Sequence, residues 1–343
     1  MKKSDWMIED EIHRLNTNWK MTAWVGGLIV VVPFVFMVGL MIMPLARSGM
    51  MRSLQLFAMD YAEFAELYLY VTLIPVMLFS LHQRRKLKTF LSYNVVQHQL
   101  EEAFDTLIKY KPAEGIPEYL VYATGFTDAV KYNCSNPKAM AHGNDYLQAT
   151  YRGVSFQFSD VTLTTGFGRG EHAFFKGQWL VINMETSISP SVTISQLSNL
   201  GGFSSLLARD SLVEMENVAF NKAFKVSTSD PHQAFYVLTP QMMEFLLSGK
   251  GMPVGNKHIC LTQKQLHLAI NTNRDSFEPC HRVGDLAKLR KQIDEEINFI
   301  KGVIDQLLKQ DNLFTPKQKK VKEVPEPRKS STREYGQIYT RPT

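Results

Sequence analysis

The spacing of apolar and polar positions divides the chain into an apolar N-terminal part, a central part with strand periodicity and a C-terminal helical segment. Trp24–Leu45 carries no charged residue and, as a helix, would be about 33 Å long, enough to cross a bilayer. A second uncharged apolar run, Leu67–Leu81, is lengthened backwards by Phe64 and Ala65. We therefore expect a transmembrane helical hairpin over residues 24–81, with spans 24–45 and 62–81.

Basic residues near the spans predict the orientation of this hairpin. They are frequent before the first span and after the second, and sparse between the two; the residues are Lys2, Lys3, Arg14 and Lys20 before, Arg47 and Arg52 between, and Arg84, Arg85, Lys86 and Lys88 after. The positive-inside rule then places both termini in the cytoplasm, with 1–23 as a cytoplasmic segment. No small-residue cleavage site follows the first span, so we interpret it as a retained anchor. The three cysteines are too few and too scattered for a disulfide framework.

Helical periodicity continues beyond the second span. Apolar residues recur with helical spacing from Leu87 to Ile108, and Pro112 ends the pattern, which predicts a helical stalk over residues 82–111.

Residues 112–282 are expected to form a cytoplasmic α+β domain with an antiparallel sheet. Val154, Phe156 and Phe158 alternate with polar residues, and a second alternating run over 174–184 follows a glycine-rich turn, which predicts a hairpin of two long strands. Further strands are expected at 222–228, 233–239, 257–262 and 265–271. Thr239 and Pro240 are typical of the start of a helix.

Residues 283–310 carry a heptad pattern. Leu286, Ile293, Ile300 and Leu307 are seven residues apart, with charged residues between them, which predicts a coiled coil or a helix packed on the stalk. A protein partner or a homo-oligomer formed through this segment is expected. The tail, 311–343, has no periodicity and several prolines, so it is predicted to be disordered.

Residues 315–343 of the tail also carry the net charge of the chain, which is +5. This location argues against a nucleic-acid-binding domain, because the rest of the chain is balanced and the tail has no interleaved aromatic residues. Contact with anionic lipid is one alternative, and a purely solubilising tail is another. The candidate lipid-binding residues are Lys317, Lys319, Lys320 and Lys322.

Candidate sites for chemistry are few. His258 and Cys260 point to the same side of a predicted strand, and Cys280 and His281 follow, so the four side chains could bind zinc. Their spacing matches no established zinc motif, and buried strand residues plus a loop pair are the simpler interpretation. Glycines at 166, 168 and 170 suggest a phosphate loop, but a strand follows them where a phosphate loop needs a helix.

The acidic residues support no catalytic assignment. Glu63 and Glu66 lie at the outer end of the second span, where we expect solvated carboxylates, although a transport role in an oligomer is an alternative. Glu214 and Glu216 are expected to be exposed at a strand edge. No nucleophile elbow or paired-histidine helix occurs, so we assign no catalytic residue and no cofactor, and the sequence argues against an enzyme.

A set of short motifs resembles an uncharacterised bacterial two-pass membrane protein family, domain-of-unknown-function family 3137. The motifs are Gly143-Asn-Asp-Tyr146, Phe158-Ser-Asp160, Phe175-Lys-Gly177, Lys225-Val226, Leu238-Thr-Pro240 and Phe277-Glu-Pro279. The resemblance covers roughly residues 84–280 and departs at Asn217-Val218, where an Asp-Pro pair is usual. It implies a bacterial inner-membrane protein with a cytoplasmic α+β domain, and it transfers no catalytic residue.

Our first hypothesis is a non-enzymatic, membrane-anchored interaction or scaffold protein. Met242 and Met243, with Phe235, Tyr236 and Phe245, would suit an adaptable contact patch, although core packing is the simpler use of these residues. The alternatives are a membrane-bound, metal-dependent enzyme or sensor, and an accessory protein of an oligomeric transporter.

Overall fold

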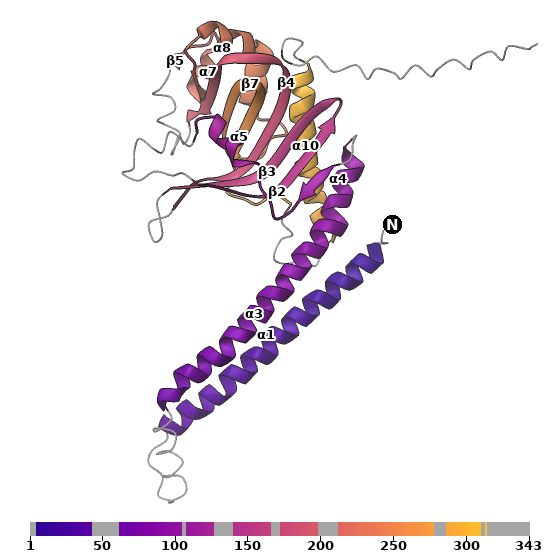
Figure 1. The fold of residues 1–343 in the computed structure, drawn as a ribbon, viewed down its shortest axis with the longest axis vertical. Helices are drawn as coiled ribbons and strands as arrows, with labels where there is room; N and C mark the ends of the chain where they lie inside the picture. The colour runs from indigo at the N-terminus through magenta and orange to yellow at the C-terminus, as the bar shows by residue number, and fades with distance from the viewer. Residues whose placement is uncertain are drawn as a thin grey trace, which may run out of the picture.

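The computed structural model describes residues 5–42, 62–104, 108–126, 140–165, 172–197, 212–277, 286–309 and 313. It shows an α+β domain from which a long helical hairpin projects (Figure 1). The α+β class and the antiparallel sheet predicted from the sequence are confirmed.

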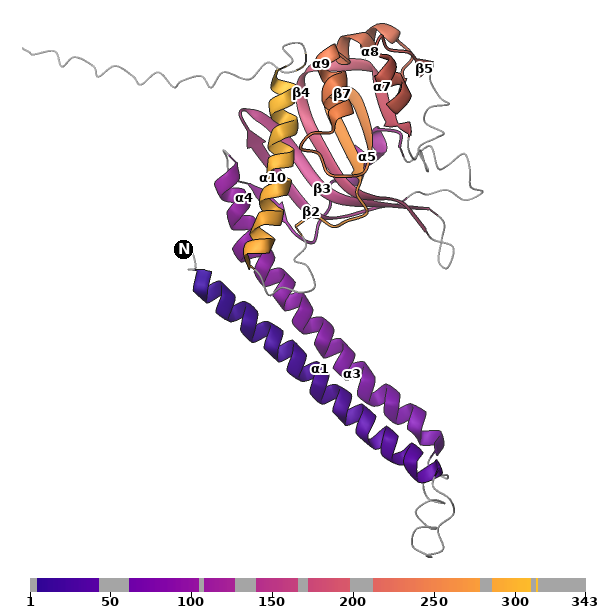
Figure 2. The same ribbon diagram turned by 180° about the vertical axis from the view of Figure 1, so that it is seen from behind.

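The hairpin consists of α1 (Asp5–Ile42) and α3 (Ala62–Leu91), which lie side by side (Figure 2). Among the described residues, no helix combines the length and the apolarity that crossing a membrane requires. The predicted transmembrane hairpin, with spans 24–45 and 62–81, is therefore wrong. The prediction considered the apolar runs alone, whereas α1 begins in the acidic segment at Asp5 and α3 continues through Arg84 and Arg85.

The two helices of the hairpin approach closely at Gly26. A Cβ at this position would overlap the side chain of Val76, whereas a Cβ on the neighbouring Gly27 would meet nothing within 4 Å. Gly26 is buried between the helices, so its missing side chain allows them to pack.

The predicted stalk enters the domain as a continuous helical segment. After α3 the chain forms one π-helical turn, η1 (Ser92–Val96), and then α4 (Gln97–Ala103). Leu91, Val96 and Leu100 are fully buried there, so this end of the helix belongs to the core of the domain.

Within the residues that the structure describes, the sheet has seven strands, and all of their pairings are antiparallel. The strand order is β1 (Lys109–Lys111), β2 (Met140–Tyr151), β3 (Val154–Thr165), β4 (His172–Gln196), β6 (Phe224–Ser227) and β5 (Leu212–Val213), and β7 (Asn256–Asn271) also pairs with β4. The predicted hairpin is the β3–β4 pair. Sequence analysis missed β2, because the turn formers at Gly143 and Asn144 obscured its alternation.

Two strand predictions differ from the structure. The strands expected at 257–262 and 265–271 are one continuous strand, β7, which follows the long β4 through its irregularities. The strand expected at 233–239 is α8 (Pro231–Val237), because Asp230 caps a helix by accepting a hydrogen bond from the His232 amide. An Asp-Pro pair suits a helix start as well as a turn.

Each face of the sheet has its own apolar layer. The first face holds Phe156, Phe158, Leu180 and Ile182 and packs against α7 (Val218–Ala223), α8, α9 (Pro240–Ser248) and α10 (Leu286–Leu308). The second face holds Phe175 and Trp179 and packs against α5 (Glu118–Ala123) and Phe126. Figure 1 shows α5 and α10 on opposite sides of the strands.

The heptad residues of α10 are buried inside this domain. Leu286, Ile293, Ile300 and Leu307 belong to the core of the first face, and α10 contacts both α4 and η1. The apolar face of the helix is therefore occupied by its own chain. The structure does not show the predicted coiled coil. Of the two alternatives predicted for this segment, a helix packed against the end of the stalk agrees better with the position of α10.

Candidate functional site: a polar row beneath helix α10

Polar side chains form a row across the first face of the sheet, between its apolar residues. Asp160 on β3 is directly opposite Asn144 on β2 and Gln178 on β4. The next inward pair is Phe158 and Leu180, which are fully buried. The polar row is thus set into the core side of the sheet, where each of its groups needs a hydrogen-bond partner.

A β-bulge places Asp145 at one end of this row. The register of β2 and β3 shifts between Asn144 and Leu147, and Asp145 has a φ of 57°. A bulge inserts an extra residue and redirects a side chain. Here the Asp145 carboxyl accepts hydrogen bonds from the Tyr110 hydroxyl at 2.6 Å and from the Asn144 side-chain amide at 2.7 Å.

Ser276 and Glu296 continue the row towards α10. The backbone amide and the hydroxyl of Ser276 both donate to the Asp160 carboxyl, the hydroxyl at 2.7 Å. The Gln178 amide nitrogen donates to Ser276 Oγ at 2.8 Å and to Glu296 Oε2 at 2.6 Å. One hydrogen-bonded chain therefore connects the last helix with the centre of the sheet.

Burial raises the pKa of every carboxyl group in this row. Desolvation raises the pKa of Asp160 to about 8, against the opposing hydrogen bonds from Ser276. It raises the pKa of Glu296 to about 7, against the hydrogen bond from Gln178, and that of Asp145 to about 6, against the hydrogen bond from Tyr110. The negative charges of the neighbouring Asp145 and Asp275 also raise the pKa of Asp160. The row therefore exchanges protons near neutral pH.

A cleft of about 910 Å³ opens between α10, the beginning of β4 and the segments that precede and follow β7. Gln178 and Glu296 line it, so the polar row reaches its wall. Its other lining residues include charges of both signs and apolar side chains: Lys176, Met252, Pro253, Val254, Arg274, Asp275, Glu295 and Phe299. Gln178 is 3% exposed, and its Oε1 has no hydrogen-bond partner in the described structure.

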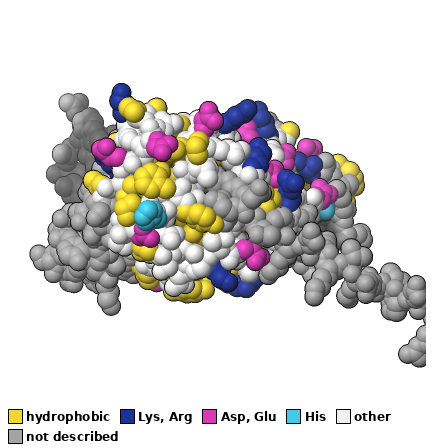
Figure 3. All heavy atoms as spheres, turned by 90° about the horizontal axis from the view of Figure 1, so that it is seen from above, with side chains coloured by type: hydrophobic (Ala, Val, Ile, Leu, Met, Phe, Trp, Pro, Cys, Tyr) yellow, Lys and Arg dark blue, Asp and Glu magenta, His cyan; other side chains and the backbone are white. Residues whose placement is uncertain are grey.

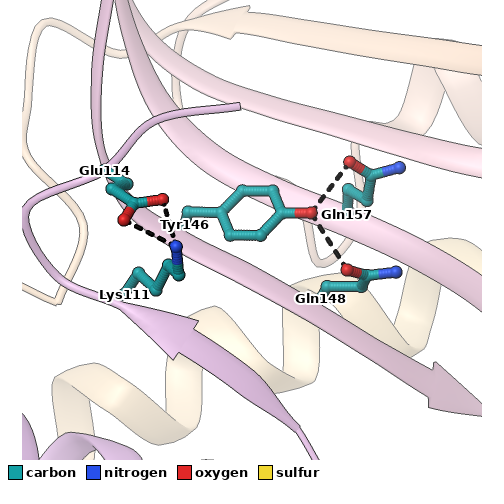
Figure 4. A network of polar contacts seen from close by, with 5 residues as sticks. All are labelled: Lys111, Glu114, Tyr146, Gln148 and Gln157. Atoms are coloured by element: carbon teal, nitrogen blue, oxygen red, sulfur yellow. Dashed lines mark hydrogen bonds and ion pairs between the residues drawn. The ribbon is translucent and has the colours of Figure 1, made fainter. Parts of the chain in front are cut away.

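A second group of polar contacts lies around the middle of β2 (Figure 4). The Tyr146 hydroxyl is 3.1 Å from Oε1 of both Gln148 and Gln157, and Lys111 forms an ion pair with Glu114 at 2.5 Å. The Tyr146 contacts join β2 to β3, the ion pair holds the turn after β1, and neither adjoins a described cleft. We interpret these contacts as structural.

The two metal-site residues that the structure describes lie on the second face of the sheet. His258 and Cys260 are both 1% exposed; His258 Nδ1 is 3.2 Å from Ser195 Oγ, and Cys260 Sγ is 3.9 Å from the Thr124 carbonyl. Burial lowers the pKa of His258 to about 4 and raises that of Cys260 to about 12. This environment keeps His258 uncharged and Cys260 protonated.

Cys280 and His281 fall outside the described residues, so the predicted four-residue metal site is not tested and stays a prediction. Within the described ranges, no group of three or more potential ligands is close enough to hold a metal ion. His267, also buried on the second face, accepts a hydrogen bond at Nδ1 from the indole Nε1 of Trp179 at 3.4 Å.

Several other residues that the sequence suggested as functional lie outside the residues that the structure describes. These are the glycine-rich turn at 166–170 and the candidate lipid-binding lysines of the tail, Lys317, Lys319, Lys320 and Lys322. Glu63 and Glu66 are in the first turns of α3, but their side chains are not described.

The remaining candidates are described, and none adjoins the cleft. Glu214 and Glu216 follow β5 and are exposed, as expected. Met242 and Met243 are buried in the core, whereas Phe235 and Tyr236 are exposed. Seen from the end of the domain that carries α7 and α8, hydrophobic side chains surround a histidine (Figure 3). Because Met242 and Met243 are buried, they contribute to core packing and not to a contact patch.

Sequence analysis missed the polar row, although two signals were available. The alternation that points Phe156 and Phe158 inward also points Asp160 inward, and the heptad series Leu289, Glu296 and Val303 has one acid between two buried residues. A polar residue at an inward position of an otherwise apolar pattern is the sign of a buried polar group.

The fold and the site define an α+β domain with a polar cleft, carried beside a helical hairpin. Residues 173–309 match the model of a family described as a protein of unknown function (DUF3137), so the chain carries a domain of this family. The resemblance to domain-of-unknown-function family 3137 is thereby confirmed over a segment that starts later than expected and includes α10. No curated protein and no solved structure matches the chain.

Proposed function

We propose that this protein is a non-enzymatic interaction protein that associates with a second copy of itself through its helical hairpin. The observation that supports this proposal is the apolar surface on both helices. Trp24 is 74% exposed, and exposed apolar residues continue along α1 and α3: Val25, Leu28, Val32 and Val35, then Val71, Ile74, Met77, Leu78 and Phe79. An exposed apolar surface of this kind marks a contact site.

A second hairpin is the occupant that suits this surface best. Two antiparallel hairpins can pack as a four-helix bundle, in which each helix buries an apolar stripe. The other apolar helix of the chain, α10, has its face occupied within the domain, which leaves the hairpin as the candidate for self-association. The location of the protein in the cell stays a prediction.

Sedimentation velocity of the full chain, at concentrations from 1 to 50 µM, tests the proposal. We expect a defined dimer, and we expect Val32→Glu and Met77→Glu to make it monomeric, because each would bury a charge in the interface. Val254→Glu is the matched control, since Val254 is exposed but lies at the cleft, away from the hairpin.

Three results would contradict self-association. A monomeric native chain is one, and a dimer that survives both hairpin substitutions is another. The third is binding of the native chain to phospholipid vesicles in preference to self-association, which would assign the apolar surface to lipid.

A further inference from the structure

The cleft beneath α10 combines features that the interaction proposal does not use. At its floor, the buried Gln178 holds Glu296 through its amide nitrogen while its own carbonyl oxygen has no described partner. Glu296 uses one carboxyl oxygen for this bond, and its side chain lines the cleft. An unpaired buried acceptor costs about 1–3 kcal/mol, which a bound donor would offset.

Positive charge lies beside these acceptors. Lys176 precedes Gln178 by two residues on the same face of β4, a separation of about 7 Å. Its ammonium group forms no ion pair with any described residue, and the exposed Arg274 is close enough to lower the pKa of Glu296. The cleft thus presents a carboxylate and an amide oxygen next to a lysine that forms no ion pair within the described part of the chain.

Apolar side chains form another wall of the cleft. Met252 and Phe299 are largely covered, whereas Val254, between Gly251 and Gly255, is 94% exposed at the edge. A ligand with two opposite charges and an apolar part would be matched on all three sides. The volume of about 910 Å³ is ample for a molecule of this kind.

We propose that this cleft binds a free amino acid with an apolar side chain. The ammonium group of the ligand contacts Glu296 and completes the hydrogen bonding of Gln178, its carboxylate contacts Lys176, and its side chain lies against Met252 and Phe299. The hydrogen-bonded chain through Ser276 to Asp160 holds Gln178 in place and connects the ligand with the centre of the sheet. This inference is independent of self-association through the hairpin.

Isothermal titration of the full chain with L-phenylalanine at pH 7 tests the proposal. We expect binding that weakens at least tenfold for N-acetyl-L-phenylalanine, which lacks the ammonium charge, and for L-phenylalanine amide, which lacks the carboxylate. Glycine should also bind at least tenfold more weakly, because it leaves the apolar wall uncovered.

Variants assign these contacts to residues. Glu296→Gln keeps an acceptor for Gln178 but removes the charge, and it should weaken phenylalanine binding at least tenfold; Lys176→Gln should do the same. Glu244→Gln and Lys264→Gln, at exposed positions outside the cleft, are the matched controls and should change affinity less than twofold. Thermal melting of each variant establishes that it is folded.

Proton release gives an independent readout. The pKa of Glu296 is about 7, so a bound ammonium group would lower it and release protons at pH 7. The apparent binding enthalpy should therefore depend on the ionisation enthalpy of the buffer in the native chain and lose that dependence in Glu296→Gln. No binding of phenylalanine at millimolar concentration, or equal weakening by the control variants, would overturn the proposal.

Discussion

Asp160 and Ser276 are 116 positions apart in the chain and are joined by two hydrogen bonds, in which the amide and the hydroxyl of Ser276 donate to one buried carboxyl group. This contact attaches the segment after β7 to the middle of β3. Through Gln178 it also reaches α10. Protonation in the polar row is therefore linked to the packing of the last helix.

The stability of the protein should fall as the pH rises from 6.5 to 8. Folding raises the pKa of Asp160 from 3.8 to about 8 and that of Glu296 from 4.5 to about 7. In this window the folded state binds protons that the unfolded state does not, so raising the pH favours unfolding. We expect a loss of about 1–2 kcal/mol, measured by urea denaturation at a series of pH values.

Asp160→Asn should remove most of this pH dependence, and Glu296→Gln a smaller part. The buried histidines oppose this trend in part, because burial lowers the pKa of His258 and His267 from 6.5 to about 4, so near pH 6.5 the unfolded state binds protons that the folded state does not. They do not reverse it, because the unfolded imidazoles lose most of these protons by about pH 7.5, whereas Asp160 and Glu296 keep theirs to higher pH. Stability that is constant or rises over this window would show that the row is ionised throughout.

Tyr110→Phe should destabilise the domain by about 1–3 kcal/mol. The substitution removes the hydroxyl that donates to Asp145 at 2.6 Å and leaves a buried carboxyl group with fewer donors. Tyr119→Phe is the control, because Tyr119 is exposed on α5 and its change should stay within about 0.5 kcal/mol. Equal free energies of unfolding for the two variants would contradict the role of the Tyr110–Asp145 bond.

Val218→Pro should stabilise the protein by up to about 1 kcal/mol. Asn217 caps α7 by accepting a hydrogen bond from the Phe220 amide at 3.0 Å, and Val218 is the exposed first residue of that helix. Proline suits this position, and Asn217 already has the extended conformation that precedes a proline.

Asn217-Val218 stands where an Asp-Pro pair is usual in family 3137, and Asn217 still provides the helix cap. Asn217→Ala should cost about 1 kcal/mol by removing it. Both changes are measured by thermal and urea unfolding, and destabilisation by Val218→Pro would show that the Val218 amide has an essential partner.

Gly26→Ala and Gly27→Ala should act in opposite directions on the hairpin. Alanine favours a helix over glycine by about 1 kcal/mol, so Gly27→Ala, where the added Cβ meets nothing, should stabilise α1. At Gly26 the same Cβ would overlap Val76 and push the helices apart. Hydrogen exchange of the α1 amides measures the stability of the helix in each variant. Equal protection in the two variants would mean that the helices do not pack at Gly26.

Local pattern was sufficient for much of the secondary structure. Alternation at Phe156 and Phe158 predicted β3, Thr239 with Pro240 predicted the start of α9, and the heptads predicted α10, because these signals depend on neighbouring residues alone. The same signals were ambiguous where two structures share one pattern, as at Asp230-Pro231. The apolar runs likewise predicted the two helices of the hairpin correctly, but the prediction that these helices span a membrane was wrong.

The sequence by itself determined which positions are apolar and most of the helical and extended segments, with β2 and α8 as exceptions. Only the tertiary structure decided what covers each apolar face and which polar residues meet. The bulge at Asp145, the pairing of Asp160 with Gln178 and the arrival of Ser276 and Glu296 depend on strand register and on the docking of α10. These contacts join segments far apart in the chain, and neighbouring residues carry no information about a partner more than a hundred positions away.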